Sequence, residues 1–139
     1  MKSSAPTPAP VSSPPTSALL VDDDDFMLDF VGDMLSELGL SDIKTANSGI
    51  SGAQVFDQSA VKPEVVLCDL CMPDSDGFEF MEALAERKYA GGVILVSGMD
   101  SRTLNSASLM GKFHRLKILA TISKPVNKQA LSEALSKLR

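Results

Sequence analysis

The chain has 139 residues, which suits one domain, and it is 44% hydrophobic and 22% charged, as ordinary globular proteins are. Its formal net charge of -5 argues against a nucleic-acid-binding surface, which needs a basic face to displace counterions. No apolar run approaches the roughly 20 residues of a membrane span, so we expect neither nucleic acid nor membrane as a partner.

Residues 1–17 are mainly Ser, Pro, Ala and Thr, with hardly any large apolar side chain. Such a segment cannot bury enough surface to offset the entropy lost on ordering, so we expect a disordered tail followed by one domain over residues 18–139. The tail also lacks the apolar central region of a secretory signal, and we therefore expect a cytoplasmic protein.

The first half of the domain predicts two strands and two helices. An apolar strand at 18–21 runs into four aspartates at 22–25, and a weaker strand is expected at 43–46. A second helix begins at Ser48. Helical spacing of apolar residues predicts the first helix, capped by Asp24 or Asp25 and ended by Gly39; its expected core face is Phe26, Met27, Phe30, Val31, Met34, Leu35 and Leu38.

The second half repeats the alternation. A fully apolar strand at 65–68 ends at Asp69 and is followed by a Pro/Asp/Gly loop and a helix from Gly77, with Phe78, Met81 and Leu84 on its core face. A strand at 93–96 closes at Ser97, a helix is expected at 101–113, and a strand at 116–122 runs into Lys124. A 3-4-3 spacing predicts the last helix through Leu131, Ala134, Leu135 and Leu138.

Strands that alternate with helices indicate the α/β class with right-handed crossovers and a parallel sheet. Five such units fit a three-layer, doubly wound, flavodoxin-like sheet in the order 2-1-3-4-5. Its switch point lies between the first and third strands, where ligands bind at the carboxyl ends of the strands.

Polar residues follow four of the five strands: Asp22 and Asp23, then Asp69, Ser97 and Lys124. In a parallel sheet these ends share one edge, so three carboxylates converge. Carboxylates that close repel one another unless a cation is present, and Mg²⁺ takes such oxygen ligands. A lysine and a serine beside them suit a phosphoryl group, and an aspartate can accept phosphate covalently.

Four short motifs at these strand ends resemble the receiver domain of two-component response regulators, over a stretch from about residue 18 to the C-terminus. The motifs are Leu20-Val21-Asp22-Asp23, Cys68-Asp69 with Met72-Pro73 and Asp76-Gly77, Val96-Ser97-Gly98, and Lys124-Pro125.

The resemblance implies that Asp69 accepts phosphate from a phosphohistidine on a sensor histidine kinase or a histidine phosphotransfer protein. It implies that Asp22, Asp23, Asp69 and the backbone carbonyl of Cys71 hold Mg²⁺. Ser97, with Gly98 leaving the approach open, and Lys124 would bind phosphoryl oxygens, and the Lys124-Pro125 peptide would be cis. The domain would catalyse only its own phosphorylation and dephosphorylation, and a possible output domain would lie outside this chain.

One residue departs from the family pattern. Receivers usually carry Tyr or Phe three residues before the lysine, and that residue swings inward as the switch serine moves; here the position is Thr121. The aromatic relay is therefore absent or rebuilt.

Two alternative functions stay open at this point. A degenerate receiver would act as a constitutive docking module. A Mg²⁺-dependent phosphohydrolase similar to the haloacid dehalogenase family would need a second aspartate two residues after Asp69, where this chain has Cys71. Redox or zinc chemistry at Cys68 and Cys71 is disfavoured, because Cys68 falls in a buried strand and His114 is the sole histidine.

Overall fold

The computed structural model describes residues 16–70, 76–98 and 115–138. Residues 1–15 of the tail expected at 1–17, the loop at 71–75 and the helix expected at 101–113 lie outside these residues. The end of the expected tail is ordered, because Thr16 bonds to Glu64 and Ser17 begins the first strand. The strands are β1 (Ser17–Val21), β2 (Asp42–Ala46), β3 (Val65–Asp69), β4 (Gly92–Ser97) and β5 (Lys117–Ser123); the helices are α1 (Asp25–Glu37), α2 (Gly49–Gln58), α3 (Asp76–Glu86) and α5 (Lys128–Ser136).

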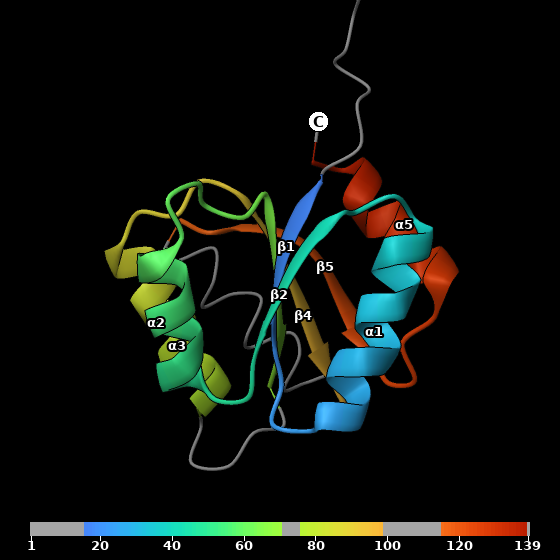
Figure 1. Ribbon diagram of the computed structural model, residues 1–139, viewed down its shortest axis with the longest axis horizontal. Coiled ribbons are helices and arrows are strands. Elements are labelled where there is room, and N and C mark those ends of the chain that lie inside the picture. Colours follow the sequence, from blue (N-terminus) through green and yellow to red (C-terminus); the bar gives the residue numbers. More distant parts are fainter. Residues whose placement is uncertain (1–15, 71–75, 99–114, 139) are drawn as a thin grey trace, which may run out of the picture.

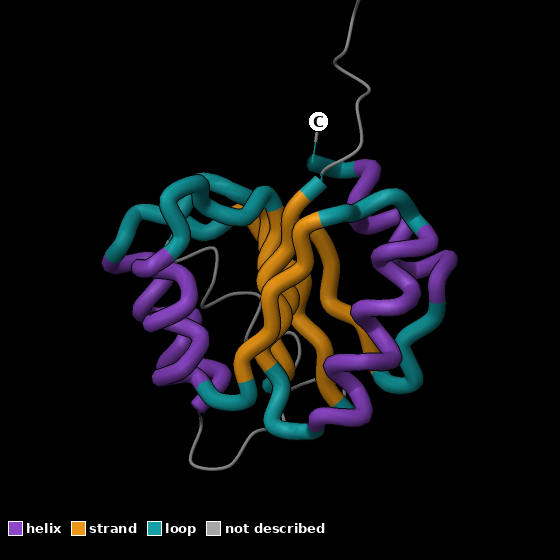
Figure 2. Tube along the Cα trace, in the orientation of Figure 1, coloured by secondary structure: helices purple, strands orange, loops and turns teal. Residues whose placement is uncertain are grey.

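The five strands form one parallel sheet in the order β2-β1-β3-β4-β5, which confirms the predicted fold class. Helices α1 and α5 cover one face of the sheet, and α2 and α3 cover the other (Figures 1 and 2). The order reverses between β1 and β3, so the carboxyl ends of these two strands flank the switch point where open α/β sheets bind ligands.

Each face of the sheet has its own apolar core. Side chains of α1 and α5 pack on one face around Leu20, Leu67 and Ile94. Side chains of α2 and α3 pack on the other face around Leu19, Val66 and Leu95. Strand β3 is buried along its whole length. A central strand covered on both faces has a continuous apolar sequence, and that run is what predicted it.

Polar caps begin the helices where the sequence indicated. Asp24 accepts a hydrogen bond from the Phe26 N–H (3.0 Å) at the start of α1, and Ser48 accepts one from the Ser51 N–H (3.0 Å) at the start of α2. Gly39, with φ of +106°, follows α1 in the left-handed conformation that glycine adopts readily. In the described part of the chain, no helix has both the length and the apolar content to cross a membrane.

The predicted core faces of two helices were partly wrong. Phe26 and Phe30 are 72% and 42% exposed, and their rings stack on each other 6.1 Å apart. Val31, Met34 and Leu35 of the predicted face are buried, and they are joined by Leu28, which was not predicted. Two apolar stripes overlap in this helix, and spacing alone does not decide which one faces the sheet. In α3 the same ambiguity explains why Phe80, which is fully buried, was not predicted on the core face.

Candidate functional site

Three carboxylates meet at the carboxyl edge of the sheet, at the lower end of the strands in Figure 1. Asp22 follows β1, Asp69 ends β3, and the pairing of Val21 with Cys68 sets these two strand ends side by side. Carboxylate oxygens of Asp22, Asp23 and Asp69 lie within 4.8 Å of one another. Asp22 and Asp69 are only 7% and 3% exposed, whereas Asp23 is exposed to solvent.

Backbone hydrogen bonds fix Asp22 in the cluster. Its own N–H donates to the Ala46 carbonyl (3.1 Å), and its Oδ1 accepts from the Asp24 N–H (2.9 Å). The pKa of Asp22 is raised from its ordinary value of 3.8 to about 7, chiefly by burial. The charge of Asp69 also raises this pKa, while the Asp24 N–H and Lys124 lower it. The raised pKa shows that negative charge is unfavourable at this site, and a bound cation would relieve it.

Lys124 is the cation that the described residues place against these carboxylates. Its Nζ lies 3.5 Å from Asp69 Oδ2 and 3.9 Å from Asp22 Oδ2. The Lys124–Pro125 peptide is cis, as expected. One ammonium group facing three carboxylates leaves an excess of negative charge, which suits a divalent cation with oxygen ligands.

Ser97 reaches the same edge from β4. Ser97 is fully buried and pairs with Ser123 of the neighbouring strand β5. On its other side, Asp69 of β3 pairs with Val96, the residue before Ser97. The Lys124 N–H donates to the Ser97 carbonyl (3.0 Å), so the ends of β4 and β5 are joined at the site.

The remaining predicted residues are placed less centrally or lie outside the described part. Gly98 follows Ser97 and is exposed. Thr121 is also exposed; it pairs with Leu95 and so sits two residues before the level of Ser97 on its strand. The carbonyl of Cys71 falls within residues 71–75, which are not described.

Gly77 is a residue of the site that the sequence analysis used as a helix start and as part of a family motif, without a structural role at the site. A Cβ at this position would lie 2.5 Å from the backbone oxygen of Asp69. Only glycine therefore lets α3 begin so close to the end of β3. The Asp76-Gly77 pair was the signal in the sequence, because a glycine directly after a strand-end loop often marks a close backbone approach.

The chain is similar to known proteins over nearly the whole of this domain. The family model described as "Response regulator receiver domain" matches residues 18–136. The transcriptional regulatory protein GlrR of Escherichia coli is 31% identical over 126 residues, covering 90% of this chain and 26% of GlrR. The chemotaxis protein CheY of Listeria monocytogenes is 28% identical over 84 residues, covering 60% of this chain and 69% of CheY.

A solved structure supports the same relationship. The chain resembles a crystal structure of a response regulator from Colwellia psychrerythraea with a TM-score of 0.74 and 28% identity, over 88% of this chain and 95% of that one. The chain spans only about a quarter of GlrR.

Proposed function

The chain belongs to the response regulator receiver domain family, and on that basis we propose that it is the phosphoacceptor of a two-component phosphorelay. Asp69 receives the phosphoryl group in this proposal. One observation carries it: the buried Asp69 carboxylate ends the central strand, 3.5 Å from Lys124 Nζ and within 4.8 Å of the carboxylates of Asp22 and Asp23.

The donor set fits Mg²⁺. Asp22, Asp23 and Asp69 supply carboxylate oxygens, the ligands that this ion prefers, and the Cys71 carbonyl is the expected fourth protein ligand. When bound, the ion would neutralise charge on the carboxylates and on the incoming phosphoryl oxygens. Asp22 would then be ionised, although without a cation its pKa is about 7.

In the transfer step, an Asp69 carboxylate oxygen attacks the phosphorus of a phosphohistidine. The new P–O bond forms as the P–N bond breaks, and the electron pair of that bond stays on the imidazole nitrogen. Lys124 holds Asp69 before the reaction and pairs with a phosphoryl oxygen after it, and the Ser97 hydroxyl donates to another. Attack of water on the phosphorus later releases phosphate and restores Asp69.

The donor in this proposal is a sensor histidine kinase or a histidine phosphotransfer protein in the cytoplasm. Receiver domains act in signalling rather than as classical enzymes, and turnover here is limited to the acyl phosphate on Asp69. Output passes to a domain or partner outside this chain. Because Thr121 replaces the usual aromatic side chain, we place the switching movement in Ser97 and the joined ends of β4 and β5.

The test is acetyl phosphate with Mg²⁺, followed by intact mass of the full chain, of Asp69→Asn and of the control Asp57→Asn. Asp57 is an exposed carboxylate that pairs with Arg87, so its variant removes the same charge away from the site. We expect the wild type and the control to gain one phosphoryl group, and Asp69→Asn to gain none.

Two other results would refute the proposal. Sustained release of phosphate from p-nitrophenyl phosphate would indicate a phosphohydrolase. No gain of mass in a folded wild-type chain, with either acetyl phosphate or a phosphorylated histidine phosphotransfer protein as donor, would indicate a constitutive docking module.

A further inference from the structure

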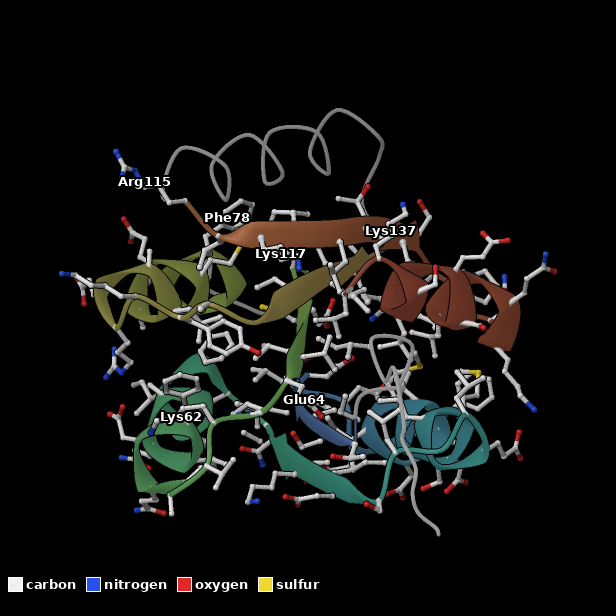
Figure 3. The ribbon with its side chains drawn as sticks, turned by 90° about the horizontal axis from the view of Figure 1, so that it is seen from above. Lys62, Glu64, Phe78, Arg115, Lys117 and Lys137 are labelled. Carbon is white, nitrogen blue, oxygen red and sulfur yellow. The ribbon has the colours of Figure 1, made fainter. Side chains whose placement is uncertain are left out.

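Several cationic side chains lie at the edge of the sheet opposite Asp69, where the strands begin; Figure 3 looks onto this edge, with Lys62, Glu64 and Arg115 labelled. Two adjoining hollows of about 310 and 520 Å³ share Lys88, Tyr89 and Ala90 in their walls. Among the described residues, no acidic side chain lines either hollow. The cations that line them are Lys62, Arg87, Lys88 and Arg115.

Two of these four cations are already engaged in the fold. Lys62 Nζ donates to the Phe56 carbonyl (2.6 Å) and lies 4.7 Å from the centre of the Phe56 ring. Arg87 forms a two-pronged ion pair with Asp57, at 2.7 and 3.0 Å. Both side chains are held in place at the rim of the smaller hollow, where the Asp57 carboxylate offsets part of their charge.

Lys88 and Arg115 differ from them in two ways. Within the described ranges, neither side chain has a carboxylate at ion-pair distance. They are also the two non-glycine residues of those ranges with positive φ, 54° and 65°. Lys88 closes α3, with its N–H on the Ala85 carbonyl and the next N–H on the Leu84 carbonyl, a position that glycine usually takes.

The left-handed conformation is unfavourable for lysine and arginine. The chain nevertheless places a cation at both such positions, and both of them line the larger hollow. Tyr89, which also lines this hollow, is held in place, because its buried hydroxyl donates to the Pro63 carbonyl (2.7 Å) and its ring meets Phe56 edge-on at 5.4 Å.

We propose that the hollow between Lys88 and Arg115 docks an acidic segment of a partner protein, with Asp or Glu side chains pairing with these two cations. Charge complementarity identifies the occupant: among the residues that the structure describes, the larger hollow is lined by two cations and by no carboxylate. A membrane is a poorer fit, because no large exposed apolar side chain of the described residues lines the larger hollow. Those side chains are Phe26, Phe30, Ile50 and Val61, and Val61 lies next to Lys62 of the smaller hollow.

Docking at this edge leaves the Asp69 edge open, because the two lie at opposite ends of the strands. The inference is independent of the proposed phosphoryl transfer, and its test needs no phosphodonor.

The probe is a fluorescein-labelled peptide of alternating Glu and Ala, and its binding to the full chain is followed by anisotropy at about 50 mM salt. The double variant Lys88→Gly with Arg115→Gly removes both cations and suits the left-handed backbone, so we expect its melting temperature to match or exceed that of the wild type. The control, Lys44→Gln with Lys128→Gln, removes the same charge from exposed ion pairs elsewhere.

We expect the first double variant to bind the peptide at least about tenfold more weakly, and the control to change affinity by less than about twofold. Amide shifts on peptide addition should centre on residues 88–91 and 115–116. Equal losses in both double variants would overturn the proposal, because they would indicate unspecific attraction, and so would a wild-type chain that fails to bind the peptide.

Two further results would overturn the proposal by indicating a different occupant of the hollow. Phosphatidylserine vesicles that sediment with the chain through Lys88 and Arg115, without peptide binding, would indicate a membrane surface. Self-association that the same double variant abolishes would indicate a second copy of the chain.

Discussion

Replacing Asp22 with asparagine tests the unfavourable charge that the site carries without a cation. The folded chain raises the pKa of Asp22 from 3.8 to about 7, chiefly through burial. Because the folded value lies above the unfolded one, this group stabilises the fold fully below about pH 3.8. That contribution is lost as the pH rises through about 7.

The size of the effect follows from the two pKa values. A rise from 3.8 to about 7 corresponds to an upper limit of about 4 kcal/mol at pH 8, at about 1.36 kcal/mol per pKa unit. Asp22 shares the site with Asp69 and Lys124, and relaxation reduces such penalties, so we expect about 1–3 kcal/mol. The asparagine side chain keeps an Oδ1 that can accept from the Asp24 N–H, as the aspartate does at 2.9 Å.

The measurement is urea unfolding in EDTA between pH 4 and 9, followed by circular dichroism. Asp22→Asn should unfold like the wild type near pH 4 and gain stability up to about pH 7, with a plateau above. The control Asp33→Asn, at an exposed position of α1, should show no comparable gain. With Mg²⁺ added, the order should reverse, because the wild type keeps the ligand that the variant has lost.

A loss of stability in Asp22→Asn at pH 8, or a gain that does not depend on pH, would refute this reasoning. Either result would mean that hydrogen bonding or packing, and not unfavourable charge, dominates at this position.

Two further predictions concern core packing and a buried hydrogen bond, and both are measured by urea unfolding. Gly52→Ala should lower the free energy of unfolding by about 1–3 kcal/mol, because its Cβ would lie 2.9 Å from the Phe80 ring. The control Gly32→Ala, whose Cβ has only ordinary contacts, should raise it by about 0.5–1 kcal/mol. Equal effects of the two substitutions would contradict the packing argument. Tyr89→Phe should cost about 1–2 kcal/mol, because it leaves the Pro63 carbonyl without its buried donor at 2.7 Å; an unchanged stability would mean that water replaces the hydroxyl.

The sequence predicted the sheet and the shared edge because both follow from short-range signals. An apolar run closed by turn residues marks a buried strand, as at 65–69, and parallel strands necessarily end on the same side. Asp69 and Lys124 could therefore be placed together although they are far apart in the chain.

The roles of neighbouring identical residues could not be derived with the same certainty. Four aspartates follow β1, and their chemistry is the same. Backbone geometry buries Asp22, leaves Asp23 exposed and turns Asp24 into the cap of α1. The choice between the two apolar stripes of α1 likewise depends on the angle at which the helix meets the sheet, and helical spacing alone does not contain that angle.

The unfavourable charge at Asp22 also bears on how a phosphoryl group would act at this site. A ligand shifts a conformational equilibrium only by the difference in its affinity for the two states. The carboxylate cluster is destabilised by its own charge. A bound cation, and then a phosphoryl group held by Lys124, would therefore bind the two states with a large difference in affinity. Since the Lys124 N–H is bound to the Ser97 carbonyl at 3.0 Å, a movement of Lys124 toward a phosphoryl oxygen would displace the ends of β4 and β5 together. If Asp69 is the phosphoacceptor that we propose, this coupling would need no aromatic side chain at position 121, and it would direct the signal to the edge strand β5.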